Sequence, residues 1–217
     1  MDKKQIEERQ IGFCESSVEL RASDDGQKRK IVGEAIVFNR ESNPIYGEFI
    51  EVIKPGALDE ADMTRVVART NHSDGQLLGT SWAGTMRMNI NENGLSYEVD
   101  IPDTVAGRDT QTYIERGDIA GSSFAFVPDY KNDGVKWIDR SAQGLLDLRE
   151  IHKIAAIYDV APVINPAYPA ASTGLREHQE FRKELEEKTQ REIDEEKRNK
   201  ANSDTLLAIH KHKLISQ

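Results

Sequence analysis

The chain has 217 residues, with 29 Lys and Arg against 38 Asp and Glu, and therefore a formal net charge of -9. This acidic balance argues against a protein that holds nucleic acid through a broad basic face, because neutralising phosphates requires clustered Lys and Arg. The single cysteine, Cys14, can form neither an internal disulfide nor a cysteine zinc cluster, so we expect a cytoplasmic protein.

Neither a targeting segment nor a membrane segment is expected. The charged residues from Met1 to Arg9 are not followed by the apolar stretch of a signal peptide. The longest apolar run, Ile154–Tyr158, is far shorter than the ~20 residues that a membrane helix needs.

The first 174 residues consist mainly of predicted β-strands. Hydrophobic and polar residues alternate from Met86 to Ile90 and again from Leu95 to Ile101, and the turn residues Asn91–Gly94 lie between them, which predicts a β-hairpin. Many strands with few helices favour an antiparallel barrel or sandwich. Further strands are expected at residues 31–38, 49–53, 65–69, 120–127, 135–138, 145–151 and 154–160.

Two helices are expected among these strands. Thr104 can cap the start of a helix over residues 105–116, and Gly117 stands where a C-terminal glycine stop belongs. A second, shorter helix is expected after Pro55, over residues 57–63.

The composition changes after Gly174. All 15 glycines and all 7 prolines lie at or before this residue, and the remaining stretch carries 10 basic and 10 acidic residues. A segment without helix breakers and rich in Glu, Lys and Arg is typical of a solvated helix or a partly disordered extension, and an assembly or targeting arm is the alternative. We therefore expect a folded domain at residues 1–174 and a charged tail at 175–217.

Only two of the five histidines, His72 and His152, lie in the expected folded domain. His72 stands in the turn-forming segment Arg69–Gly75, directly after a short predicted strand, where scaffolds present functional groups; an exposed loop histidine is the alternative. His152 follows Glu150 and Ile151 in a strand and can equally be a solvent-facing residue.

Two serines, Ser122 and Ser123, open a predicted strand directly after the glycine stop of the helix. The segment Gly121–Ala125 superficially resembles the serine elbow of α/β-hydrolases, but that motif requires a strand, a turn and then a helix. Here the order is helix, turn and strand, so this interpretation fails. By residue type alone both serines can be structural, because serine becomes a nucleophile only beside a positioned base.

Asp159 lies among apolar residues at the end of the last predicted strand, and Pro162, Pro166 and Pro169 then direct the chain into a rigid extended course. A carboxylate in apolar surroundings needs a partner, which a histidine or an arginine can supply. A structural salt bridge and a catalytic role therefore both remain open.

Short segments between residues 33 and 169 together carry a family resemblance. They are Gly33–Asn39, Glu51–Ala57, Asn71–Asp74, Leu78–Thr80, Gly84–Met88, Asn93–Leu95, Ile114–Asp118, Gly121–Phe126 and Asn165–Pro169. In this order they resemble the prohead maturation proteases of tailed phages and, more distantly, the herpesvirus assemblin protease. The resemblance implies a mostly antiparallel β-barrel with flanking helices.

The resemblance also implies a catalytic set. The histidine of the family falls on His72, its serine, which precedes a phenylalanine, falls on Ser123 rather than Ser122, and its acidic residue falls on Asp159. In such a set the histidine takes the proton of the serine and gives it to the leaving amine, while the acid holds the imidazole tautomer.

Two residues depart from the family pattern. Ser73 follows His72, where the family commonly has an aspartate, and Asp159 stands where a glutamate is usual. Glu150 and His152 are therefore the alternatives for the third catalytic residue.

The implied function is that of a serine endopeptidase packaged inside the assembling phage procapsid, in the host cytoplasm. It cleaves the scaffolding segment of the major capsid protein and itself. Its expected partners are proteins, including a second copy of the chain, with no nucleic acid, membrane, metal or cofactor. Backbone N–H groups near residues 121–124, or Arg116, are the candidate oxyanion donors.

Two rival functions belong to other classes. A noncatalytic internal scaffold would keep the same fold and tail. A metal-dependent hydrolase would use His72, Asp74 and His152 as ligands, but two histidines without close helical spacing are thin support for zinc.

Overall fold

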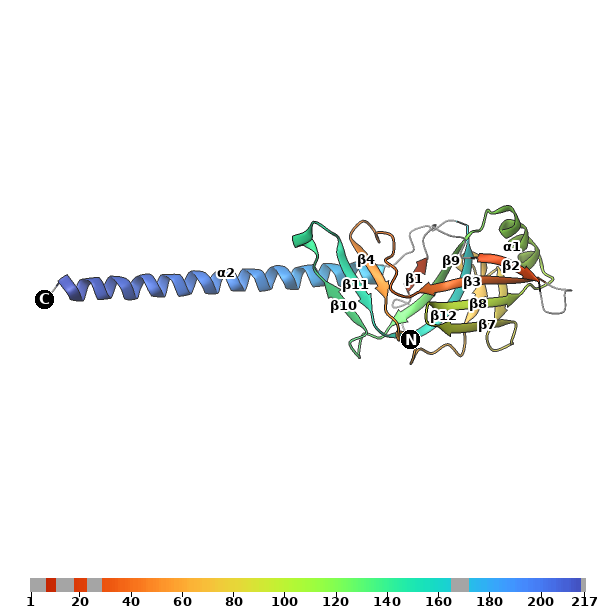
Figure 1. Ribbon diagram of the computed structural model, residues 1–217, viewed down its shortest axis with the longest axis horizontal. Coiled ribbons are helices and arrows are strands. Elements are labelled where there is room, and N and C mark those ends of the chain that lie inside the picture. Colours follow the sequence, from red (N-terminus) through yellow and green to blue (C-terminus); the bar gives the residue numbers. More distant parts are fainter. Residues whose placement is uncertain (1–6, 11–17, 23–28, 165–171, 216–217) are drawn as a thin grey trace. The chain divides into compact units, whose positions relative to one another are not determined.

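The computed structural model describes residues 7–10, 18–22, 29–164 and 172–215 (Figure 1). The chain divides into two compact units, Met1–Leu175 and Arg176–Gln217. The elements are β1 (Glu7–Gln10), β2 (Val18–Ala22), β3 (Arg29–Val37), β4 (Phe49–Ile53), β5 (Val67–Arg69), β6 (Leu77–Thr80), β7 (Met86–Asn91), β8 (Gly94–Asp100), α1 (Val105–Arg116), β9 (Gly121–Pro128), β10 (Val135–Ile138), β11 (Asp147–Ile151), β12 (Ile154–Val163) and α2 (Ser172–Ile215).

The described strands of the first unit form three sheets. The largest has the order β1-β9-β12-β5-β6, the second β2-β3-β8-β7 and the third β10-β11-β4. Most neighbours are antiparallel, but β12 and β5 are parallel, as are β11 and β4. The prediction of a mainly β fold is confirmed. The described strands form open sheets rather than the expected closed barrel, because alternation along a strand identifies the strand and not its partners.

The hydrophobic core joins the four-stranded sheet to the five-stranded sheet. Buried side chains of β3 and β8, such as Ile31 and Val99, belong to one cluster with Phe124 and Phe126 of β9. The predicted hairpin is confirmed as β7 and β8, which pair from Met86 opposite Val99 to Asn91 opposite Gly94. The strand β9 is therefore fixed from one face by the core.

Helix α1 has the predicted boundaries. The hydroxyl of Thr104 accepts a hydrogen bond from the N–H of Gly107 at 3.1 Å. Gly117 is left-handed, with φ of 80°, and its N–H donates to the carbonyl of Ile114. The cap and the stop predicted from the sequence are therefore confirmed.

The second predicted helix, at residues 57–63, is wrong. Residues 57–60 form turns and Asp62 forms an isolated parallel bridge with Ala156. The carbonyl of Ala57 accepts from the N–H of Ile154 at 2.8 Å rather than from the next helical turn. The N–H of Asp62 likewise donates to the carbonyl of Ala155, and the carbonyl of Asp62 accepts from the N–H of Ile157. Backbone hydrogen bonds to β12 thus replace the helical ones that local propensity favours.

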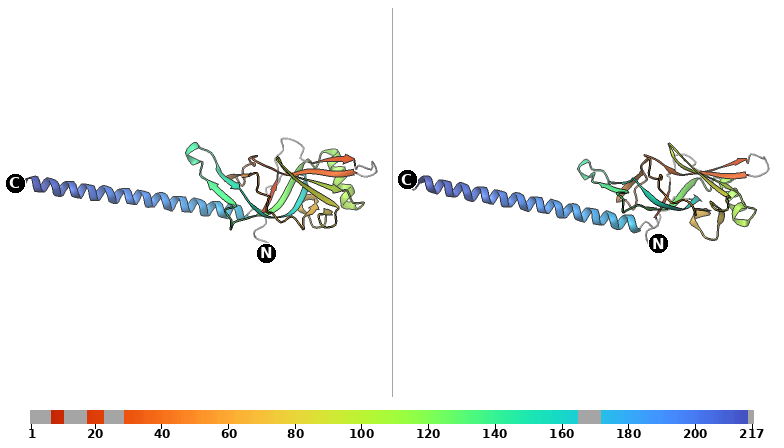
Figure 2. Two further views of the ribbon diagram at one scale, coloured as in Figure 1. Left: turned by 60° about the horizontal axis from the view of Figure 1, so that its bottom comes forward. Right: turned by 90° about the horizontal axis from the view of Figure 1, so that it is seen from below.

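One long helix, α2, of 44 residues begins at Ser172, just before the predicted tail, and ends at Ile215. Every residue from Glu186 to Lys200 is exposed, and the ion pair between Arg191 and Glu187 joins successive turns. The views of Figure 2 show this helix without a sharp kink. Within the described ranges, no helix is long and apolar enough to cross a membrane. A domain boundary at residue 174 stays a prediction.

Candidate active site

Ser122 and Ser123 point to opposite faces of β9, because side chains alternate along a strand. The hydroxyl of Ser122 donates to the hydroxyl of Tyr97 at 3.2 Å. The Oγ atom of Ser123 lies 2.6 Å from Nε2 of His72. Both serines are fully buried, and of the two Ser123 is the one that contacts the imidazole.

A strained turn positions His72. After β5 ends at Arg69, residues Thr70–His72 form a short 3-10 turn, in which Asn71 has φ of 51° and His72 has φ of 55°. Left-handed backbone is uncommon for non-glycine residues and is often found at functional sites. The side-chain oxygen of Asn71 accepts the N–H of Ile164 at 3.0 Å, which ties the turn to the end of β12.

A second contact holds the same turn from α1. The hydroxyls of Thr70 and Thr110 lie 2.6 Å apart, and both residues are buried. Thr110 also donates its hydroxyl to the carbonyl of Ala106 within the helix. The turn that carries His72 is therefore anchored on two sides, which offsets the cost of its backbone conformation.

Asp159 is fully buried in β12 and is bonded through both carboxylate oxygens. Its Oδ1 lies 2.6 Å from Nδ1 of His72. Its Oδ2 accepts from Nε of Arg69 at 2.6 Å, and a terminal nitrogen of the same guanidinium is also in contact. Both guanidinium nitrogens contact the same oxygen, Oδ2, which leaves Oδ1 to the imidazole. The sequence suggested a histidine or an arginine as the partner, and the structure supplies both.

The imidazole of His72 thus bridges Ser123 and Asp159. A carboxylate accepts and cannot donate, so its contact at Nδ1 favours the tautomer with the proton on that nitrogen. Nε2 is then free to accept the proton of the Ser123 hydroxyl. This is the arrangement in which a histidine can activate a serine nucleophile.

Arg69 is the member of this cluster that the sequence analysis did not identify. It lies three residues before His72 and also forms an ion pair with Asp74, whose side chain is exposed. Val67 of β5 is the partner of Asp159 in β12, so Arg69, two residues further along β5, lies on the same face of the sheet. The signal in the sequence that could have pointed to Arg69 is that a buried carboxylate such as Asp159 requires a cationic partner.

Glu150 and His152, the alternatives for the third site residue, lie at the three-stranded sheet. Nε2 of His152 lies 2.9 Å from Glu150, which also pairs with Lys54 at 3.6 Å. Burial raises the pKa of Glu150, but the hydrogen bond from His152 and the nearby lysine charges outweigh it and leave the pKa below its usual value. These two residues therefore form a pair of their own.

Two other predictions concern Arg116 as an oxyanion donor and a metal site formed by His72, Asp74 and His152. Arg116 forms an ion pair with Asp118 at 2.8 Å, at the end of α1. In the part of the chain that the structure describes, no three His, Cys, Asp or Glu residues form a group that could hold a metal. The segment Asn165–Pro169 lies outside the described residues.

Tyr97 supports the site from the core side of β9. Burial raises the pKa of its hydroxyl above the ordinary value; the hydrogen bond from Ser122 opposes this shift and the charge of Asp159 adds to it. The tyrosine is therefore a neutral phenol. A Cβ atom on Gly33 would lie 2.4 Å from the Tyr97 ring, so any larger residue at this position would force the ring to shift where it crosses β3.

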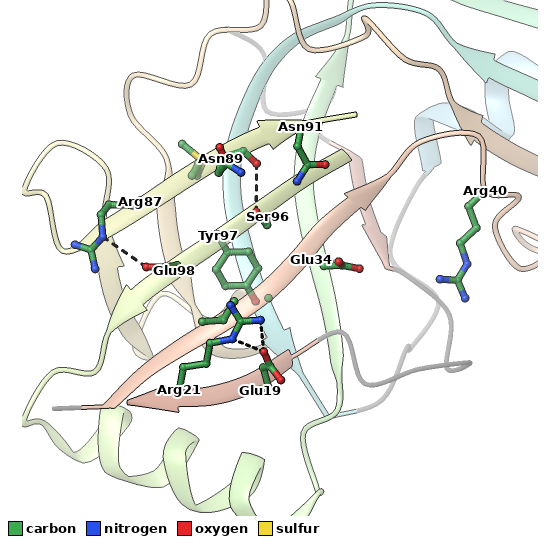
Figure 3. Close-up of a pocket in the computed structure, with 13 residues that line it drawn as sticks. Glu19, Arg21, Glu34, Arg40, Arg87, Asn89, Asn91, Ser96, Tyr97 and Glu98 are labelled. Carbon is green, nitrogen blue, oxygen red and sulfur yellow. Dashed lines mark hydrogen bonds and ion pairs between the residues drawn. The ribbon is translucent and has the colours of Figure 1, made fainter. Parts of the chain in front are cut away.

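A depression of about 560 Å³ lies on the four-stranded sheet, and Figure 3 shows Tyr97 among the residues that line it. Its wall is polar and carries charges of both signs, and Arg21 and Arg87 are paired there with Glu19 and Glu98. The bridged histidine, serine and aspartate do not belong to this lining. The depression is therefore separate from the candidate active site.

One of three comparisons with known proteins gives a match, and it agrees with the family predicted from the short segments. A family model described as caudovirus prohead serine protease matches residues 16–184, which is more than half of the chain. Neither the curated proteins nor the solved structures give a match. The family acts in capsid maturation, and the three residues that the structure brings together lie within the matched range of this chain. The chain therefore belongs to the caudovirus prohead serine protease family.

Proposed function

We propose that the protein is a serine endopeptidase of phage capsid maturation in which Ser123 is the nucleophile. His72 is its general base and acid, and Asp159 orients the imidazole. The observation that carries this proposal is the single imidazole bonded at 2.6 Å to the hydroxyl of Ser123 on one side and to the carboxylate of Asp159 on the other.

The first half of the reaction forms an acyl-enzyme. Oγ of Ser123 attacks the scissile carbonyl carbon while Nε2 of His72 takes the hydroxyl proton. The new C–O bond gives a tetrahedral intermediate, and the C–N bond breaks as the imidazolium returns that proton to the leaving amine. Asp159 stabilises the imidazolium in between. Water then attacks the ester with the same proton transfers and frees the carboxylate product.

Arg69 is a positioning residue in this scheme. A buried carboxylate must be compensated, and a partner on each oxygen holds it in one orientation. With Oδ2 occupied by the guanidinium, Oδ1 faces Nδ1 of His72. Arg69, which holds Asp159 in place, therefore lies in the same segment of the chain as the general base His72.

The proposed substrates are the scaffolding segment of the major capsid protein and the chain itself, inside the procapsid. Membership of a prohead protease family supports capsid or scaffold proteins as partners. Helix α2, which is exposed from Glu186 to Lys200, is a candidate for an arm that is bound during assembly or removed by self-cleavage.

Intact mass measured over time on concentrated protein tests the nucleophile. We expect the wild type and Ser122→Ala to release defined fragments and Ser123→Ala to remain whole. Ser122→Ala is the matched control, since it removes the same hydroxyl from the other face of β9.

A fluorophosphonate probe tests the same point without a protein substrate. Attack by Oγ of Ser123 forms an O–P bond and expels fluoride, and His72 takes the proton. A folded wild-type protein that is neither labelled nor cleaved, even with the capsid protein added, would instead be a noncatalytic scaffold. Activity lost in a strong chelator would favour a metal-dependent hydrolase.

A further inference from the structure

The strand that carries Ser123 has the N-terminal strand of the chain as one of its two neighbours. In the five-stranded sheet β9 lies between β12 and β1, and β1 is the edge strand (Figure 1). The pairing of β1 with β9 is antiparallel and runs from Glu7 opposite Phe126 to Gln10 opposite Ser123. A short extended segment of this chain therefore ends directly beside the proposed nucleophile.

The proposed catalytic residues are closed off in this arrangement. Ser123 and Asp159 have no exposed surface, and the side chain of His72 is 10% exposed. A scissile carbonyl must come within about 3 to 3.5 Å of the attacking oxygen. A polypeptide substrate can therefore reach Ser123 only after some segment beside it has moved.

Of the two strands beside β9, β1 is the one that can leave at least cost. β12 has ten residues and is paired on both sides, with β9 and with β5. β1 has four residues and is paired on one side. Short edge elements open more readily than central strands, because fewer hydrogen bonds and contacts are lost.

Departure of β1 would turn β9 into an edge strand. Its outward N–H and C=O groups would then be available to pair with another extended polypeptide, which is a common mode of peptide recognition. Main-chain pairing needs no particular side chains, so it suits a peptidase that acts on segments of capsid and scaffold proteins. A substrate in that place would lie antiparallel to β9 and pass Ser123 where Gln10 now lies.

We infer that β1 occupies the binding place of the polypeptide substrate and keeps the peptidase latent until an extended segment of a protein substrate replaces it. This inference rests on the proposed function and deepens it. It gives the N-terminal strand a regulatory role, and it gives the free edge of β9 the role of substrate-binding strand.

A reversible crosslink tests the inference in the full chain. Glu8 and Ala125 are directly opposed in the β1–β9 pair, so their replacement by cysteine places two thiols at a spacing suited to a disulfide. The double variant Glu8→Cys/Ala125→Cys is made together with Cys14→Ser, which removes the competing native thiol. The variant Glu8→Cys/Cys14→Ser is the control for oxidation itself.

The readout is the rate at which a fluorophosphonate labels Ser123, in the oxidised form and again after reduction of the same sample. We expect the oxidised double variant to be labelled at least about tenfold more slowly than its reduced form, because the crosslink removes the open population. The control should be labelled at one rate in both states. Recovery on reduction shows that the crosslinked protein was folded.

A second pair of variants tests whether weakening β1 makes the labelling of Ser123 faster. Arg9→Pro constrains φ within β1 to about -65°, away from the usual antiparallel value, which weakens the strand, whereas Arg9→Ala leaves φ unconstrained. We expect faster labelling of Arg9→Pro than of Arg9→Ala and the wild type.

The failures are distinguishable. Equal labelling of the oxidised and reduced double variant, with no gain in Arg9→Pro, would overturn the role of β1 and leave Ser123 as the nucleophile. Absence of labelling in every folded form, even with the capsid protein added, would overturn the proposed function and this inference together.

Discussion

At the scale of single residues, the site depends on which of two adjacent serines faces the imidazole. Alternation along β9 sends Ser122 to Tyr97 and Ser123 to His72. The same alternation on β5 and β12 brings Arg69 and Asp159 to one face of the sheet. The candidate site is therefore a consequence of strand register as much as of residue type.

Arg69 and Asp74 offer a matched pair of substitutions. Arg69→Ala leaves the buried carboxylate of Asp159 without its cation, so we expect a loss of about 1–3 kcal/mol in the free energy of unfolding and a lower kcat. Asp74→Ala removes only an exposed ion pair of the same arginine and should cost at most about 1 kcal/mol. Urea unfolding and the rate of self-cleavage measure both effects. Equal effects of the two variants would contradict the positioning role of Arg69.

Gly33 tests the packing behind the site. A methyl group at Gly33 would overlap the ring of Tyr97, so Gly33→Ala should destabilise the protein by about 1–3 kcal/mol. Gly75→Ala is the control, because no atom lies within 4 Å of its Cβ position. Thermal unfolding of the two variants measures the difference, and an unchanged midpoint for Gly33→Ala would show that the ring can move away.

At the scale of elements, two short segments adopt backbone conformations that their own sequences do not favour. The turn after β5 carries His72 in left-handed backbone and is held by β12 and α1. The segment at residues 57–63 forms backbone hydrogen bonds with β12 instead of the helix that its sequence predicts. In both cases β12 supplies hydrogen bonds that override local preference.

The pair of Glu150 and His152 makes the stability of the three-stranded sheet depend on pH. The pKa of Glu150 is lower in the folded protein than its ordinary 4.5, so the folded state binds fewer protons than the unfolded state. This contribution to stability is present above pH 4.5 and is lost as the pH falls through the folded pKa. We expect Glu150→Gln to lower the free energy of unfolding at pH 7 and to lower it less near pH 3, measured by urea unfolding. An equal loss at both pH values would contradict a role for the charge.

At the scale of the whole chain, the tail differs from the strands that precede it. From Glu186 to Lys200 its residues are exposed, so this stretch contributes little packing, and removing the chain from residue 186 onward tests whether the tail is needed for stability. We expect the helical circular dichroism signal to fall while the unfolding midpoint changes by no more than about 2 °C. A larger drop in the midpoint would mean that the tail stabilises the strands directly.

The sequence by itself determined the family, the mainly β class, the hairpin and the capped helix α1. These follow from local patterns: alternation, turn residues, and a threonine and a glycine at the two ends of a helix. It also indicated His72, Ser123 and Asp159 as the site, through the resemblance of short segments. Their assignment as catalytic residues stays a proposal.

Only the tertiary structure decided how the strands pair into three sheets, that Arg69 joins Asp159, and that β1 lies beside Ser123. It also decided that residues 57–63 form turns and an isolated bridge rather than a helix. The physical reason is common to all of them. A local pattern records which side chains are buried, whereas partners, register and hydrogen bonds between distant segments depend on how the whole chain packs.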